Sequence, residues 1–286
     1  MYSNKKNFIY YILNNIIIGI IPLVSLSILS RELKPEDYGL YALYLIAGST
    51  FSSFINFGLP AAHEVMFFEQ KSKFLQKKLT FSSITFILLL SVIVFIPVYF
   101  AKDVIIDTVI YDTNRNNILY LAYWSCITSS STVLFFNHLR NQGNGRDFLI
   151  YKSISSFVNL FLTLFLILSL GYNFEAFFIS TIITSLSVMI FFIVKLKLEI
   201  NSVSIPLIKE MIVIALPLFP KMILGFLRTN YDRILINNIS TQSILGTYDI
   251  GLKVSNQGYT IMNSLYNSYL PDFYKILNEK PVGYKE

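Results

Sequence analysis

The residues best suited to chemistry lie in the last third of the chain, inside segments that are otherwise apolar. Lys221, Arg228 and Asp232 are spaced so that, at about 100° per residue, they share an arc of about 40° on one helix face. A second stripe, within an arc of about 80°, consists of Asp249, Lys253, Asn256, Thr260, Asn263 and Asn267. A charged side chain at mid-helix costs about 2.5–3.5 kcal/mol on membrane-insertion scales, so it normally faces a bundle interior or a watery cavity. The two stripes therefore predict a polar cavity or pore.

Two other interpretations of these stripes stay open. The second stripe could pack against neighbouring helices through structural pairs such as Asp249–Lys253. Asp232 and Arg233 could instead lie at the outer membrane interface and extend their charged ends toward water. The cavity is favoured because the second stripe runs through most of a membrane thickness.

Other kinds of site find little support in the sequence. Cys126 is the only cysteine, so an intrachain disulfide is excluded, and its apolar surroundings favour a small buried residue. His63-Glu64 begins like the zinc-protease motif, but Phe67 stands where the second histidine should be. Neither a glycine-rich phosphate loop nor a basic run interleaved with aromatics is present. We therefore expect no metal site, no enzymatic activity and no nucleic-acid binding.

The composition indicates what positions the polar stripes. Of the 286 residues, 54% are hydrophobic and 14% are charged, and the mean hydropathy is +0.56; a soluble domain has about a quarter charged residues. The apolar residues form blocks of about 20, the helix length that crosses a bilayer core. The pattern predicts an all-α membrane protein of about eight transmembrane helices, near residues 8–30, 39–60, 79–101, 118–136, 148–170, 174–194, 211–236 and 244–270.

Basic residues indicate the orientation of these helices. Lys5 and Lys6 precede a block longer than a signal-peptide core, and no small-residue cleavage site follows, so we expect an uncleaved first helix. With a cytoplasmic N-terminus, fifteen of the 23 Lys and Arg residues fall on the cytoplasmic side and six on the other. The positive-inside rule then predicts that both termini are cytoplasmic.

Two prolines interrupt the seventh predicted helix. Pro217 and Pro220 lie in its first turns, where each removes a backbone donor and tends to bend the helix. Such a bend could act as a hinge beside a cavity or could be a static kink.

Two distant segments are alike. Gly39-x-Tyr41 leads into the second helix and Gly246-x-Tyr248 into the eighth, at an offset of 207 residues. The match fits a parallel repeat of six-helix lobes. We therefore expect a six-helix lobe over residues 1–200 and an incomplete second lobe, helices seven and eight, over residues 201–286.

Four segments, taken in order along the chain, resemble one known family. They read SRELKPEDYGLYAL after the first helix, LRNQGNGRDFLIYKSISSFVNLFLTLFLIL at the fourth-to-fifth junction, and IALPLFPKMILGFLRTNYDRILI and ILGTYDIGLKVS for helices seven and eight. They are similar to segments of the polysaccharide-repeat (O-antigen or capsule) flippases of the multidrug/oligosaccharidyl-lipid/polysaccharide exporter superfamily. The resemblance covers nearly the whole chain.

The resemblance implies a V-shaped pair of six-helix bundles around a cationic cavity. Its cargo would be a polyprenyl-pyrophosphate-linked oligosaccharide, carried across the bacterial inner membrane. The cavity cations would be Arg31, Lys221, Arg228, Arg233 and Lys253. Polar residues that orient them or bind a coupling proton or sodium ion would be Asp232, Asp249, Asn256 and Asn263. Membrane lipids, a polysaccharide polymerase and a chain-length regulator are the expected partners, with no organic cofactor.

The sequence departs from the family pattern in two ways. Members of the family usually have about twelve or more helices, so a chain of eight is expected to be a fragment, a frameshifted gene product or a truncated form. Where many have a basic residue after the second helix, this chain reads Ala61-Ala-His-Glu-Val65. Two alternative functions remain: a multidrug exporter, which would favour an acidic cavity, and a membrane glycan polymerase, which would need a large extramembrane loop.

Overall fold

The fold is all-α and spans a membrane, as predicted. The computed structural model describes residues 2–70, 72–110, 116–197, 203–256 and 258–259. Within these ranges, seven helical spans are long and apolar enough to cross a bilayer. They are Ile9–Leu29, Pro35–Glu69, Lys73–Phe100, Asn117–Asn141, Gly145–Leu168, Glu175–Leu196 and Ile205–Ile239. The chain is therefore a multi-pass membrane protein.

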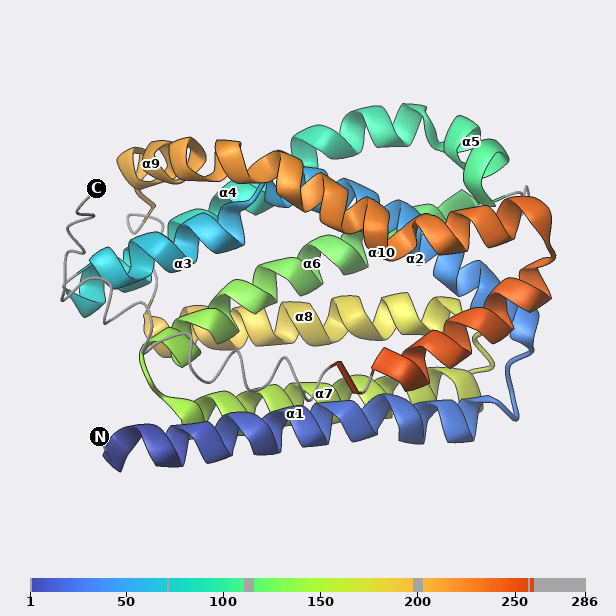
Figure 1. The fold of residues 1–286 in the computed structure, drawn as a ribbon, viewed down its shortest axis with the longest axis horizontal. Coiled ribbons are helices and arrows are strands. Elements are labelled where there is room, and N and C mark those ends of the chain that lie inside the picture. The colour runs from blue at the N-terminus through green and yellow to red at the C-terminus, as the bar shows by residue number, and fades with distance from the viewer. Residues whose placement is uncertain (1, 71, 111–115, 198–202, 257, 260–286) are drawn as a thin grey trace, which may run out of the picture.

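Short breaks divide these spans into the individual helices of Figure 1. The helices are α1 (Tyr2–Leu29), α2 (Pro35–Asn56), α3 (Leu59–Glu69), α4 (Lys73–Phe100), α5 (Lys102–Ile105), α6 (Asn116–Asn141), α7 (Gly145–Leu168), α8 (Glu175–Leu196), α9 (Ile205–Ala215) and α10 (Phe219–Ile239). A π-helical turn, η1 (Ile106–Ile110), follows α5, and a 3₁₀ turn, η3 (Leu216–Leu218), joins α9 to α10. The eighth predicted helix is described over residues 242–256, and its continuation to residue 270 lies largely outside the described residues.

The second and third predicted helices have different boundaries from those expected. The second does not end at Pro60, because α3 carries the chain on to Glu69 after a break at Phe57 and Gly58. Both break residues have positive φ, and Pro60 lies in the first turn of α3, where its missing N–H costs no helical hydrogen bond. The third helix begins at Lys73 because the Ser72 hydroxyl caps it.

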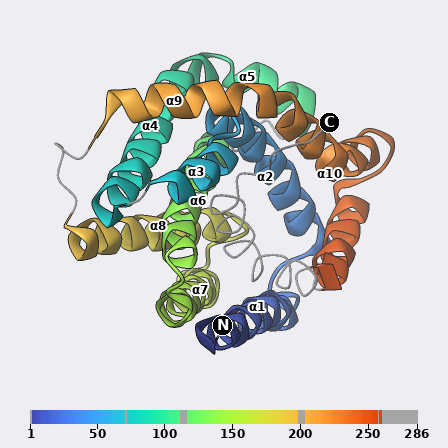
Figure 2. The ribbon, with the colours of Figure 1, turned by 60° about the vertical axis from the view of Figure 1, so that its left-hand side comes forward.

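α6 lies at the centre of the bundle and contacts α2, α4, α7 and α8. Figure 2 shows the long helices as an arc from α1 through α7 and α8 to α4, α9 and α10. α2 and α6 approach closely at Gly48, where an added β-carbon would lie 2.6 Å from the carbonyl oxygen of Ala122. Small residues allow this kind of backbone approach between membrane helices.

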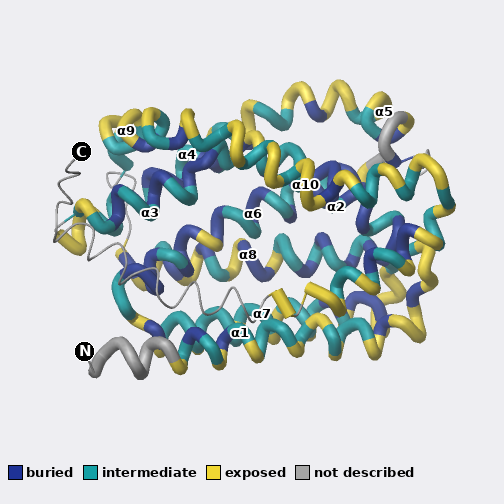
Figure 3. Tube along the Cα trace, viewed as in Figure 1, coloured by how far each residue is buried: buried dark blue, intermediate teal, exposed yellow. Residues whose placement is uncertain are grey.

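Figure 3 marks the residues of each helix that are exposed, and many of these exposed residues are large and hydrophobic. Large exposed side chains include Leu89 and Ile93 on α4 and Phe161 on α7. An apolar exterior of this kind is what a lipid environment requires, and it leaves the polar residues for the interior.

The seventh span is bent as its prolines predict. α9 ends at Ala215, η3 contains Pro217, and α10 restarts with Pro220 in its first turn. This break lies beside the break between α2 and α3: the rings of Phe57 and Phe219 are 4.6 Å apart. The second and seventh spans therefore pack against each other at the points where each is interrupted.

Candidate functional site

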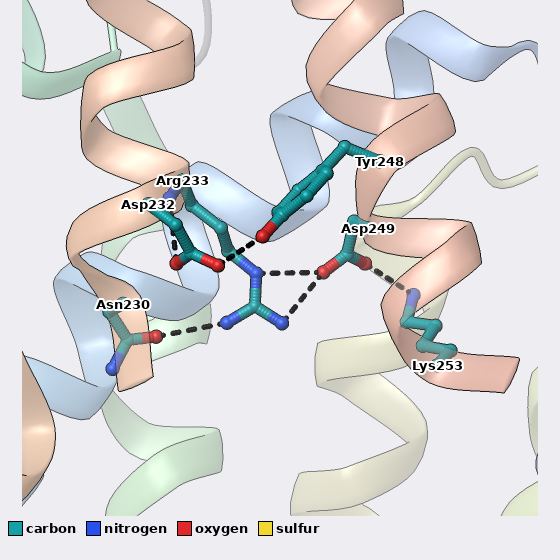
Figure 4. Close-up of polar contacts among 6 residues, drawn as sticks. All are labelled: Asn230, Asp232, Arg233, Tyr248, Asp249 and Lys253. Atoms are coloured by element: carbon teal, nitrogen blue, oxygen red, sulfur yellow. Dashed lines mark hydrogen bonds and ion pairs between the residues drawn. The ribbon is translucent and has the colours of Figure 1, made fainter. Parts of the chain in front are cut away.

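Arg233, Asp249 and Lys253 form one ionic cluster around a buried carboxylate, between α10 and the helix 242–256 (Figure 4). The Arg233 guanidinium donates through Nε and pairs through Nη2 with Oδ1 of Asp249, both at 3.0 Å. The other carboxylate oxygen of Asp249 lies 2.9 Å from the Lys253 ammonium. One carboxylate therefore holds two cations from two helices.

Asp232, Tyr248 and Asn230 complete the cluster. The Tyr248 hydroxyl donates to Asp232, and the Asn230 side-chain oxygen accepts a 3.1 Å hydrogen bond from Arg233. These contacts fix the relative position of α10 and the helix 242–256. The structural pair Asp249–Lys253, considered above as an alternative to a cavity, is thus real.

The same lysine also faces a cavity. A space of about 350 Å³ opens between α1, α2, α7, α8 and the helix 242–256. Its lining includes Tyr38, Tyr41, Phe177, Lys253 and Asn256. The Lys253 ammonium lies 4.7 Å from the centre of the Tyr41 ring and 5.1 Å from that of Tyr38, within cation–π range.

The cluster has no net charge, because Arg233 and Lys253 balance Asp232 and Asp249. Its exposed side is nevertheless cationic. The Asp249 side chain is only 3% exposed, whereas that of Lys253 is 30% exposed. Among the described residues that line the cavity, Lys253 is the only charged one. Asp232 is occupied by Tyr248 and by the backbone amide of Arg233. A ligand in the cavity would therefore meet positive charge and aromatic hydroxyls.

Of the other predicted site residues, some lie at the cavity and others lie away from it. Asn256 lines the cavity, as expected of the second stripe. Lys221 and Arg228 are exposed on α10, and Arg31 is exposed in the α1–α2 connection, so the structure does not bring these three into the cluster. Their assignment as cavity cations stays a prediction. Asn263 lies outside the described residues.

A third polar stripe, on α7, was missed by the sequence analysis. Lys152, Ser156, Asn159 and Thr163 recur at spacings of four, three and four residues, within an arc of about 60°. Asn159 and Thr163 line the cavity already described. Lys152, Ser156 and Asn159 also line a second chamber of about 320 Å³ between α1, α6, α7 and α8. The periodicity of α7 was available in the sequence as a signal.

A further polar network connects α3, α4 and α6. It lies near the end of α3 at Glu69, the start of α4 at Lys73 and the end of α6 at Asn141. The Thr80 hydroxyl lies 2.9 Å from Nε2 of His63 and 2.8 Å from Nδ1 of His138. Next to it, Arg140 forms an ion pair with Glu64. Both histidines are fully buried, so this network joins α3, α4 and α6.

Comparisons with known proteins agree with this architecture. A family model described as "Polysaccharide biosynthesis protein" matches residues 5–276. The fold is similar to the crystal structure of MATE in complex with Br-NRF, with a TM-score of 0.65 and 15% identity over 97% of this chain and 70% of that one. It is also similar to MATE in complex with MaD5, with a TM-score of 0.53 and 18% identity over 94% and 69%.

These identities are low enough that the structural likeness shows the fold alone. A comparison of the sequence with curated proteins gave no significant match. The family model, in contrast, covers nearly the whole chain, as the four sequence segments led us to expect. The chain belongs to the family of polysaccharide biosynthesis proteins.

Proposed function

We propose that this protein translocates a polyprenyl-pyrophosphate-linked oligosaccharide across the bacterial inner membrane for the synthesis of a surface polysaccharide. The observation that carries the proposal is the cavity whose charged lining is Lys253, held by Asp249 and backed by Arg233. Transport of this kind needs no covalent step. We further propose that the N-terminus is cytoplasmic, following the distribution of basic residues.

The chemistry of the cavity fits both parts of such a cargo. A pyrophosphate carries several negative charges and acceptor oxygens, and Lys and Arg bind these through charge-assisted hydrogen bonds. The hydroxyls of Tyr38 and Tyr41 and the amide of Asn159 offer the weaker, adaptable contacts that sugars require. A cationic lining favours this cargo over the positively charged drugs that an acidic cavity would take.

Asp249 is our candidate for coupling transport to a proton or sodium ion. Its carboxylate bridges the two helices that carry Arg233 and Lys253. Neutralising it would release both cations toward the cargo, which links the occupancy of the carboxylate to the affinity of the cavity. Asp232, hydrogen-bonded to Tyr248, would keep α10 in place during this change.

The test is complementation of a strain that lacks the gene. Cells would be scored for accumulated polyprenol-linked oligosaccharide and for surface glycan. The wild-type gene should restore both to normal. Lys253→Met should leave accumulated precursor and little surface glycan, while Lys209→Met, an exposed lysine on α9, should behave as wild type.

Two results would contradict the proposal. Normal surface glycan in cells that carry Lys253→Met, with protein present in the membrane, would remove the cavity from the mechanism. Normal precursor and glycan in the strain that lacks the gene would point to another cargo, and drug resistance would then be measured.

A further inference from the structure

The second chamber is a polar space around an uncompensated lysine. Lys152 projects between α6 and α7, with its ammonium 5.0 Å from the centre of the Phe136 ring and 5.8 Å from that of Phe148. Its other polar lining is made of hydroxyls and one amide: Ser129, Thr132, Ser155, Ser156, Asn159, Thr181, Thr184 and Ser185. Among the described residues, no carboxylate lines the chamber or pairs with Lys152. The chamber is therefore suited to an anion.

One hydroxyl in this chamber has no partner. Thr184 is 5% exposed, and its Oγ1 makes no hydrogen bond in the described part of the chain. A buried hydroxyl without a partner is destabilising, and a ligand oxygen in the chamber would remove that cost. Thr184 thus points to a ligand independently of Lys152.

An apolar groove adjoins the chamber. About 260 Å³ lies between α7 and α8, lined by aliphatic and aromatic side chains such as Val158, Val188 and Phe191. Phe136, Ser155 and Thr184 line both spaces, so the groove and the chamber are contiguous. Val158 and Phe191 are exposed on the outer surface of the bundle. The groove therefore opens toward lipid.

We propose that the chamber and the groove together bind a phosphate-bearing isoprenoid lipid, with its phosphate at Lys152 and its hydrocarbon chain between α7 and α8. This inference rests on the proposed function, and it identifies the site at which the lipid carrier of the cargo would first bind the protein. The two parts of the site match the two parts of such a lipid. The chamber suits its phosphate, and the adjoining apolar groove suits its hydrocarbon chain. A free phosphate would use the chamber and leave the groove empty.

The depth of Lys152 suits this occupant. It lies seven residues after Gly145, or about 10 Å along α7 from one end, on the same side as the ion pair between Lys195 and Asp147. That is about a third of the way along the 24 residues of α7, a depth at which a lysine is costly unless an anion or water meets it. Lys195 lies 3.8 Å from the centre of the Tyr151 ring at the edge of the groove.

The chamber also leads to the cavity of the cationic cluster. Ile21, Pro22 and Asn159 line both spaces. The α7 stripe therefore provides a polar path from Lys152 to Lys253. A phosphate bound at Lys152 could move along this path while its lipid chain stays in the bilayer.

The test uses the full-length protein in nanodiscs of phosphatidylethanolamine and phosphatidylglycerol. The probe is a polyprenyl diphosphate with a diazirine in its prenyl chain, and crosslinked peptides are identified by mass spectrometry. Crosslinks should fall on residues 151–158 and 184–192. Lys152→Met should lower them about tenfold, the effect of losing a charge-assisted hydrogen bond, and Lys73→Met, at an exposed lysine of α4, should leave them unchanged. Val158→Trp, which fills the groove, should lower them without changing any charge.

The competing outcomes are distinct. Unlabelled polyprenyl phosphate should compete with the probe and inorganic pyrophosphate should not; equal competition by pyrophosphate would overturn the lipid site in favour of a free anion. Crosslinks that are spread evenly over the helices, or unchanged in Lys152→Met, would overturn it outright. Crosslinking measures binding alone. Specific labelling of a chain that exports no glycan would therefore refute the proposed flippase function and support the lipid site. Export by Lys152→Met at the wild-type rate, without specific labelling, would support the flippase function and refute the lipid site.

Discussion

Gly39 of α2 and Gly246 of the helix 242–256 pack against each other backbone to backbone. A β-carbon on Gly246 would lie 2.9 Å from the amide nitrogen of Gly39 and would overlap the carbonyl of Pro35. A β-carbon on Gly39 would overlap the carbonyl of Gln242. The contact is reciprocal, because Gly246 and Gln242 each lie 207 residues after their counterparts, Gly39 and Pro35. Reciprocal contacts of this kind are typical of two segments related by a two-fold axis.

This contact predicts that Gly246→Ala separates the two helices. The added methyl has no room beside α2, and overpacking of this kind costs about 1–3 kcal/mol. We expect a lower thermal midpoint in detergent, followed through the fluorescence of Trp124, the only tryptophan. Gly251→Ala is the matched control, because a β-carbon there meets no described atom within 4 Å. Equal midpoints for the two variants would contradict the close approach.

Asp249→Asn should be more destabilising than other carboxylate-to-amide changes. It leaves Arg233 and Lys253 facing each other without a counter-charge, and breaking a buried pair costs about 3–5 kcal/mol. The control is Asp147→Asn, because the Asp147 side chain is 42% exposed whereas that of Asp249 is 3% exposed; exposed pairs contribute about 0–1 kcal/mol. Unfolding in detergent measures both.

The double variant Asp249→Asn with Lys253→Met refines this prediction. Removing one of the two repelling cations should recover part of the lost stability, as a double-mutant cycle would show. Strictly additive losses would mean that the two side chains do not interact.

The sequence was enough to predict seven membrane-spanning helical segments, although with different boundaries for the second and third, and the interruption at Pro217 and Pro220. The polar face of the eighth helix is described only as far as Asn256. The sequence was not enough to predict which charges meet. Lys221, Arg228 and Asp232 share a face of one ideal helix, yet Arg233 is the cation that reaches Asp249. The crossing of α10 with the helix 242–256 selects that contact, and crossings depend on tertiary packing that helical periodicity does not contain.

The α7 stripe shows the opposite case. Lys152 is one of the fifteen Lys and Arg residues that the sequence analysis counted on the cytoplasmic side, and the serine, asparagine and threonine that follow it on the stripe carry no charge. Their spacing of three and four residues nevertheless marks one face. The contact between His63 and His138 through Thr80, by contrast, joins three helices, and no local pattern indicates it.

Thr80→Val should weaken the association of α3, α4 and α6. The change keeps the shape of the side chain but leaves the nitrogens that face it, one in His63 and one in His138, without this partner. Each unsatisfied buried group costs about 1–3 kcal/mol. Thr229→Val is the control, since that exposed hydroxyl bonds only to its own helix. An unchanged unfolding midpoint for Thr80→Val would show that the histidines find other partners.

Asn159→Leu should slow transport without unfolding the protein. Asn159 lines both the cavity and the chamber, so leucine, of similar size, would place an apolar barrier between Lys152 and Lys253. A phosphate or sugar hydroxyl that passes an apolar point without a hydrogen bond loses about 1–3 kcal/mol, which corresponds to a rate about 10–100 times lower. Accumulated lipid-linked oligosaccharide in complemented cells measures the effect, and Asn238→Leu, at an exposed position near the end of α10, is the control. If Asn159→Leu exports glycan at the wild-type rate, the two spaces are not consecutive parts of one path, and the cargo must reach Lys253 by another route.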